Sequence, residues 1–249
     1  MLSRINNILY KDGIPVIKLH QKFVDQDPLI GQPLDYMNKY LEMFPELHTK
    51  INKDMPKKII IFYDLETTGT NVKIHGIHQI FGIIEVDGIV VDQFNYKVRP
   101  NPKAKIEQEA LDICKVTEEE ILEYPEMKRV YLKLLSLLEQ YVDRFNPKDK
   151  MWLCGFNNRG FDDQFLRSWF EQNGDSFFGS FFWSDSLDTL VLASQYLMDR
   201  RSNMPHFKLR GVARELGLEV DEDKLHDALY DVTLTRDIYR IVTGLEYEL

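Results

Sequence analysis

The sequence predicts an α/β fold, a mixed sheet with helices on both of its faces. Two patterns predict it: strand-like apolar segments first follow one another as a meander, and later strands alternate with helical segments. A mixed sheet built in this way buries both of its faces. The chain has 249 residues, of which 44% are hydrophobic and 29% charged, and is long enough to bury a full core.

We divide the chain after residue 56. Residues 1–56 are expected to form a short N-terminal extension that is punctuated by proline and glycine. Within it, Leu34–Phe44 has the apolar spacing of one short amphipathic helix, whose apolar face is expected to pack on the main domain rather than bind a partner. Residues 57–249 are expected to form the main domain.

The main domain is expected to begin with three consecutive strands. The apolar run at its start predicts a strand at Ile59–Leu65. Two further strands are expected at Ile77–Val86 and Gly88–Val98. The dipeptide Asp87-Gly88 between them is a strong hairpin signal, so these two strands should be antiparallel neighbours.

The helical segments follow the periodicity of amphipathic helices. Thr117 begins a capping-box pattern, with Glu120 three residues later. The longest helix is expected at Met127–Phe145, and a short buried strand at Met151–Cys154. The other helices are expected at Glu107–Ile113, Phe161–Gln172, Leu187–Met198, Leu209–Leu216 (ended by Gly217) and Ala228–Val242 (followed by Gly244).

Two carboxylates lie at the end of the first strand. Asp64 and Glu66 are one residue apart, and because strand side chains alternate between faces, both should point the same way. Like charges held side by side raise each other's pKa, and hard divalent cations prefer oxygen ligands. The segment Asp64–Gly69 therefore indicates a metal site; the alternative is a strand that ends in ordinary solvated acids.

Further acids and one histidine lie at strand or helix ends. Asp162 follows a buried strand, where ligands of open α/β sheets collect, although an acid there also suits the helix dipole. His226 lies just before the last helix and Asp231 about one turn into it. We interpret Ser186 as an N-cap and Asp188 as a first-turn acid with a structural role.

Composition and charge exclude several classes of protein. The net charge of −9 argues against a protein that coats duplex nucleic acid, but not against an enzyme that grips one strand end. Cys114 and Cys154 are the only cysteines, too few for a disulfide framework or a zinc site. No signal peptide and no long apolar run are recognised, so we expect a cytoplasmic protein with no membrane partner.

Three motifs together resemble the DEDD exonucleases of the histidine subclass. The order and approximate spacing are those of that family, which includes the epsilon proofreading subunit of polymerase III, RNase T and oligoribonuclease. The motifs are Asp64-x-Glu66, Asn158-x-x-Phe161-Asp162 and His226-x-Ala228-x-x-Asp231. The tyrosine subclass would carry a tyrosine at Asp227. Many relatives have histidine at Asn157, so this departure leaves the substrate preference open.

The resemblance implies a ribonuclease H-like fold with a five-stranded sheet. It also implies a 3′-to-5′ exonuclease that hydrolyses single-stranded DNA or RNA from 3′ ends and releases nucleoside 5′-monophosphates. Two Mg²⁺ or Mn²⁺ ions would be the cofactors, with Asp64 bridging them and Glu66 and Asp231 holding the ion that carries the attacking water. Asp162 would support the metals, and His226 would accept the proton of that water.

The same resemblance implies contacts with substrate. Leu65 would wedge against the terminal base, although core packing explains it equally well, and Thr67 and Thr68 would reach the 3′-hydroxyl. Asn158 would bind the strand or the metal shell, unless it forms an Asx turn. Phe161 belongs to the same motif and is also assigned to the substrate site.

Residues 200–214 contain five Lys or Arg side chains and no acid. Lys208 and Arg210 are candidates to hold phosphates of the incoming strand, and a solvated face is the alternative. His206 and Phe207 could stack on a base.

Two other functions stay open at this point. A catalytically silent nucleic-acid-binding or scaffold module would not need all four carboxylates and the histidine. A phosphodiesterase acting on short oligonucleotides or nucleotide messengers would use identical metal chemistry. No polymerase region is recognised, so a proofreading role would need a polymerase or another protein in trans.

Overall fold

A computed structural model describes residues 2–5, 8–11, 14–18, 57–222 and 228–245. The chain divides into two compact units, Met1–Lys57 and Lys58–Leu249. The first unit contains a three-stranded antiparallel sheet in the order β1-β2-β3. Its strands are β1 (Leu2–Ile5), β2 (Ile8–Lys11) and β3 (Ile14–Lys18). At four or five residues each they are too short for a clear alternating pattern, and we did not predict them; the helix expected at Leu34–Phe44 lies outside the described residues.

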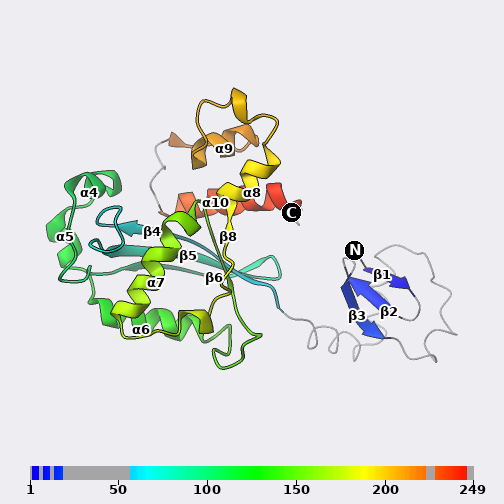
Figure 1. Cartoon of the computed structure of the whole chain (residues 1–249), viewed down its shortest axis with the longest axis horizontal. Helices are drawn as coiled ribbons and strands as arrows, with labels where there is room; N and C mark the ends of the chain where they lie inside the picture. Colours follow the sequence, from blue (N-terminus) through cyan, green and yellow to red (C-terminus); the bar gives the residue numbers. More distant parts are fainter. Residues whose placement is uncertain (1, 6–7, 12–13, 19–56, 223–227, 246–249) are drawn as a thin grey trace. The chain divides into compact units, whose positions relative to one another are not determined.

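The second unit is built on a five-stranded mixed sheet in the order β6-β5-β4-β7-β8 (Figure 1). Its strands are β4 (Ile59–Thr67), β5 (Ile77–Val86), β6 (Ile89–Lys97), β7 (Trp152–Gly155) and β8 (Leu187–Asp188). The first three pair antiparallel, whereas β7 lies parallel to both β4 and β8. The predicted meander and mixed sheet are confirmed.

The β5–β6 hairpin turns at the predicted dipeptide. Asp87 and Gly88 both have positive φ, +53° and +86°, as the tight hairpin turn requires. The register pairs Val86 with Ile89 directly beside the turn. The turn therefore fixes the first two residue pairs of the hairpin, and the register shifts by one residue between Ile84 and Glu85.

Seven helices are described in the second unit. They are α4 (Gln108–Cys114), α5 (Glu118–Leu122), α6 (Met127–Leu138), α7 (Asp162–Gln172), α8 (Thr189–Tyr196), α9 (Leu209–Glu215) and α10 (Ala228–Thr243). The Thr117 side chain accepts a hydrogen bond from the backbone of Glu120, which confirms the predicted cap. No helix within the described residues is long and apolar enough to cross a membrane.

Two helix predictions were wrong at their ends. α6 ends at Leu138 rather than at Phe145, although Val142 is still buried. The apolar residues beyond Leu138 are therefore buried in a turn and not in a helix. Arg144 helps to fix this turn, because its Nη2 lies 3.2 Å from Oδ2 of Asp175. The segment predicted as a helix from Leu187 begins instead as strand β8 and becomes helical only at Thr189.

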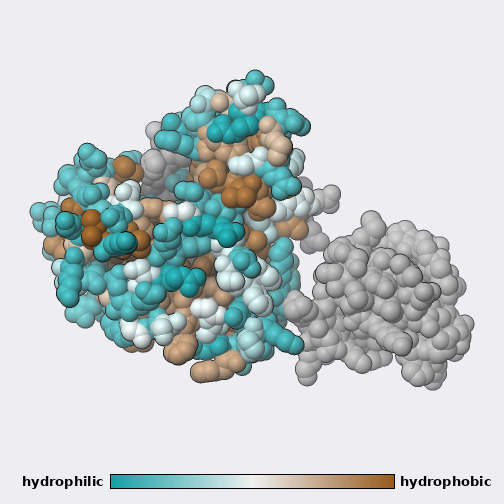
Figure 2. Space-filling view, viewed as in Figure 1, coloured by the Kyte–Doolittle hydropathy of each residue, from teal (hydrophilic) through white to brown (hydrophobic). Residues whose placement is uncertain are grey.

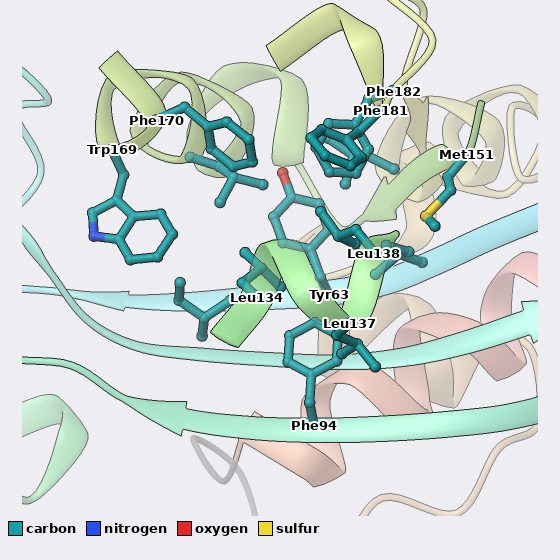
Figure 3. Close-up of a cluster of buried hydrophobic side chains, with 14 of the residues drawn as sticks. Tyr63, Phe94, Leu134, Leu137, Leu138, Met151, Trp169, Phe170, Phe181 and Phe182 are labelled. Atoms are coloured by element: carbon teal, nitrogen blue, oxygen red, sulfur yellow. The ribbon is translucent and has the colours of Figure 1, made fainter. Parts of the chain in front are cut away.

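Helices cover both faces of the sheet (Figure 1). On one face, Tyr63 and other odd-numbered residues of β4 join a core with α6 and α7, in which aromatic side chains are numerous (Figure 3). On the other face, Phe62 packs edge-on against Tyr239 of α10, with ring centroids 5.4 Å apart. Because faces alternate along β4, Asp64 and Glu66 continue the face that α10 covers.

Candidate active site

Four carboxylates from three elements gather at the end of β4. Asp64 and Glu66 come from β4, Asp162 is the first residue of α7, and Asp231 lies in the first turn of α10. The pKa of Asp64 is well above its usual value, first because burial desolvates the carboxylate and then because Asp162, Glu66 and Asp231 are negatively charged neighbours. The structure therefore brings together all four acids that the motifs predicted.

Asp162 is held by the strand that carries Asp64. It is only 5% exposed, and its Oδ1 accepts a hydrogen bond from the backbone N–H of Leu65 at 3.2 Å. Burial raises the pKa of Asp162 to about 8, against two backbone hydrogen bonds that lower it.

Glu66 has a partner that sequence reasoning missed. The thiol of Cys114, the last residue of α4, donates a hydrogen bond to Oε2 of Glu66 at 2.9 Å. Burial, followed by the negative charge of Glu66, raises the pKa of the Cys114 thiol well above its usual range, so the thiol keeps its proton. No motif marks this cysteine, because only the fold brings α4 to β4.

A second network lies directly beside the acids and was also missed. Oδ1 of Asp163 accepts hydrogen bonds from the Tyr63 hydroxyl at 2.5 Å and from Nδ2 of Asn158 at 3.1 Å. Its Oδ2 accepts from the Ser186 hydroxyl at 2.5 Å. Asn158, which is fully buried, therefore supports the start of α7 through Asp163.

The predicted cap of α8 was wrong by two residues. Ser186 binds Asp163, whereas Asp188 is the N-cap and accepts a hydrogen bond from the Leu190 N–H at 3.0 Å. Asp188 also accepts from the Asn157 N–H at 3.0 Å. The same carboxylate thus ties the motif-two loop to α8, which a local sequence pattern does not reveal.

The residues assigned to the terminal nucleotide are mostly buried. Leu65 is 4% exposed and lies in the core beneath the sheet, which favours its packing role. The Thr67 hydroxyl donates to the Gly69 carbonyl at 2.9 Å, and the Thr68 hydroxyl donates to the Lys105 carbonyl at 2.6 Å. Phe161 is half-buried against Phe165. Their contacts with substrate stay predictions.

Arginines of the basic stretch at residues 200–214 form ion pairs with acids that lie just beyond residue 214. Arg200 lies 3.4 Å from Glu215, and Arg210 lies 3.5 Å from Glu222, which also pairs with Arg214. Lys208 is exposed at the start of α9. A strand-binding role for Lys208 and Arg210 stays a prediction. The ion pairs favour the alternative, in which the basic side chains form a solvated face.

The predicted general base, His226, lies outside the described residues. α10 begins two residues later and buries Ala228 and Val232 against the sheet, and this packing places Asp231 near Asp64. The role of His226 stays a prediction.

The acid cluster has the donor chemistry of a hard-cation site. All four donors are carboxylates, and the raised pKa values of Asp64 and Asp162 show that their negative charge is unfavourable without a cation. In the arrangement seen, no three acidic, histidine or cysteine side chains of the described segments are placed to hold a metal ion.

Comparison with known proteins identifies the class. The sequence model of the RNase T type exonucleases matches residues 61–239, and the chain belongs to this exonuclease family. This membership confirms the resemblance to the DEDD exonucleases. Residues 61–239 span all the predicted metal ligands and His226.

Particular relatives are larger proteins. The chain is 25% identical over 179 residues to a DNA polymerase III of PolC type from Thermotoga petrophila, covering 72% of this chain and 11% of that protein. A PolC-type polymerase from Staphylococcus haemolyticus is 24% identical over 197 residues, which is 78% of this chain and 12% of the relative. The chain thus spans about a tenth of these relatives.

Solved structures of similar fold include E. coli exonuclease I in complex with a dT13 oligonucleotide. The TM-score is 0.60 at 22% identity, over 75% of this chain and 41% of exonuclease I. The zinc-bound form of the exonuclease I complex with single-stranded DNA gives the same score and identity over 40% of its chain. The ribonuclease H-like exonuclease fold is therefore confirmed.

Proposed function

We propose that the protein is a divalent-metal-dependent 3′-to-5′ exonuclease that releases nucleoside 5′-monophosphates from single-stranded DNA or RNA. The observation that carries this proposal is the convergence of Asp64, Glu66, Asp162 and Asp231 in one electrostatically coupled cluster. Membership of the exonuclease family supports nuclease chemistry. The oligonucleotide bound to exonuclease I supports a single-stranded substrate.

The protein's own contribution is to hold the four acids and to move a proton. Bound divalent cations would supply charge neutralisation and lower the pKa of an attacking water. Leu65 fixes Asp162 through its N–H, and Cys114 fixes Glu66 through its thiol. His226 is proposed to accept a proton from the attacking water, because imidazole titrates near neutral pH.

A buried ion-pair network anchors the helix that carries Asp231. Oε1 of Glu85, on β5, accepts a hydrogen bond from Arg240 of α10 at 2.8 Å and another from Arg236. Arg240 also donates to the carbonyl of Gly88 in the hairpin turn. α10 is thereby fixed to the same sheet that carries Asp64.

The PolC-type relatives favour one partner. Because they are DNA polymerases of which this chain matches about a tenth, we include a polymerase acting in trans among the proposed partners. Co-purification with a replicative polymerase would support this part of the proposal.

The direct test is hydrolysis of labelled single-stranded DNA and RNA with Mg²⁺, Mn²⁺ or EDTA. We expect mononucleotide release with either metal and none in EDTA. Hydrolysis that persists in EDTA would contradict the proposed metal site. A strand carrying a 3′-phosphate should resist the enzyme, because charge and bulk would stand where a hydroxyl is expected.

A further inference from the structure

An open groove of about 490 Å³ lies along α7. Its walls come from three segments that are distant in sequence: the loop after β4, the start and outer face of α7, and the loop before β8. Hydrophilic residues cover much of the surface over α7 (Figure 2). The groove residues used below are Lys73, Arg159, Asp163, Arg167, Glu171 and Ser186.

Three cations line this groove. Among the described residues, none of Lys73, Arg159 and Arg167 forms an ion pair. The Arg167 guanidinium lies 4.4 Å from the centre of the Phe178 ring, which orders the side chain and leaves its N–H groups able to donate. This differs from residues 200–214, where arginines pair with Glu215 and Glu222.

Two acids also line the groove, and one of them is held in a hydrogen-bond network. Asp163 is occupied on both oxygens, by Tyr63, Asn158 and Ser186. Glu171 is the other acid of the lining. The three cations and two acids give the lining a formal charge of +1, in a chain whose net charge is −9.

The groove starts beside the acid cluster. Asp163 forms part of its wall, and the preceding residue, Asp162, belongs to the four acids. Arg159 stands in the short turn Asn158–Gly160 that leads directly into α7. A strand whose 3′ end reaches Asp64 could therefore continue into the groove.

We infer that this groove binds the phosphates of a single strand upstream of its 3′ end. This inference rests on the proposed function and gives the strand a path other than residues 200–214. Guanidinium groups bind phosphate oxygens through paired N–H donors, and such contacts are independent of base sequence. The groove would therefore serve strands of any sequence and act only on substrates long enough to reach it.

The test compares two double variants with equal loss of charge. Lys73→Gln with Arg159→Gln removes two groove cations, and Arg129→Gln with Lys148→Gln removes two exposed cations that do not line the groove. For each protein, kcat/KM is measured on a strand of about twelve nucleotides and on a dinucleotide. Strand affinity is measured against salt with Ca²⁺ in place of Mg²⁺.

We expect the groove variant to lose roughly tenfold in kcat/KM on the longer strand, and clearly less on the dinucleotide. Its plot of log affinity against log salt should flatten by about 1.4, or 0.7 for each lost contact, while the control stays near wild type. Equal losses on both substrates, or an unchanged salt slope, would overturn the inference. A wild-type protein that binds the strand but cleaves nothing would refute the proposed function instead, and the salt slope would still decide the groove.

Discussion

The Cys114 thiol donates a hydrogen bond to the Glu66 carboxylate, with 2.9 Å between Sγ and Oε2. The two residues are 48 positions apart, so the bond ties α4 to the end of β4. It orients one of the four acids without adding a charge to the cluster. The thiol is thus a positioning group for a proposed metal ligand.

Replacing Cys114 should therefore affect metal binding more than folding. We expect Cys114→Ala to raise the Mn²⁺ concentration needed for half-maximal activity by roughly threefold to tenfold, because one hydrogen bond to a charged group is lost. Cys114→Ser keeps a donor and should recover much of this loss. Calorimetric Mn²⁺ titration checks the result; equal affinity in wild type and Cys114→Ala would assign the thiol to packing alone.

The raised pKa of Asp162 predicts how stability depends on pH. The carboxyl titrates near 8 in the folded protein and near 3.8 when unperturbed, so between these values the folded state binds more protons than the unfolded state. The metal-free protein should therefore lose stability from this group as pH rises from about 4 to 8.

Melting temperatures in EDTA across this pH range test the prediction. Asp162→Asn cannot titrate, and its melting temperature relative to wild type should rise with pH. A difference between the two proteins that is constant with pH would show that Asp162 titrates normally.

Removing one partner of the buried Glu85–Arg240 pair should destabilise the protein strongly. Glu85 is 3% exposed, and Glu85→Ala would leave Arg240 and Arg236 without their shared acceptor. Breaking a buried pair costs about 3–5 kcal/mol, and urea unfolding should show a loss of this order. The exposed pair Lys97–Glu120 provides the control, since Lys97→Gln should have little effect. Similar effects of the two variants would refute the anchoring role of Glu85.

His226→Ala tests the proposed general base. We expect turnover to fall by roughly 10²- to 10⁴-fold at neutral pH, with a smaller deficit at high pH, where hydroxide replaces the base. Mn²⁺ affinity should fall much less than turnover. If turnover is unchanged, His226 has no part in proton transfer.

The sequence predicted the sheet well where local chemistry determines it. Ile77–Val86 forms the predicted strand, and Asp87-Gly88 forms the predicted turn, because turn geometry and apolar alternation are local properties. The end of α6 was mispredicted because Val142 is buried without being helical. Apolar spacing reports which residues are covered, and tertiary contacts decide the backbone conformation.

In the candidate site, too, local sequence patterns predicted some features and tertiary contacts determined the others. The acids of the cluster were predicted because they occur in motifs with fixed spacing. Cys114 and Asp163 were missed because their partners, Glu66 and Tyr63, lie 48 and 100 residues away. The pairing of Arg210 with Glu222 was not predicted, because Glu222 lies outside the basic stretch. Such pairings exist only once the chain has folded.

The most direct measurement of the central claim follows digestion of a 5′-labelled single strand in Mg²⁺. Wild type and Asp112→Asn, which removes an exposed acid of α4, should shorten the strand one nucleotide at a time from its 3′ end and release 5′-monophosphates. Asp64→Asn should release none, while its metal-free form should melt at the same or a higher temperature because repulsion in the cluster is relieved. Wild-type rates in Asp64→Asn, or shortening from the 5′ end, would contradict the assignment of this cluster as a 3′-to-5′ exonuclease site.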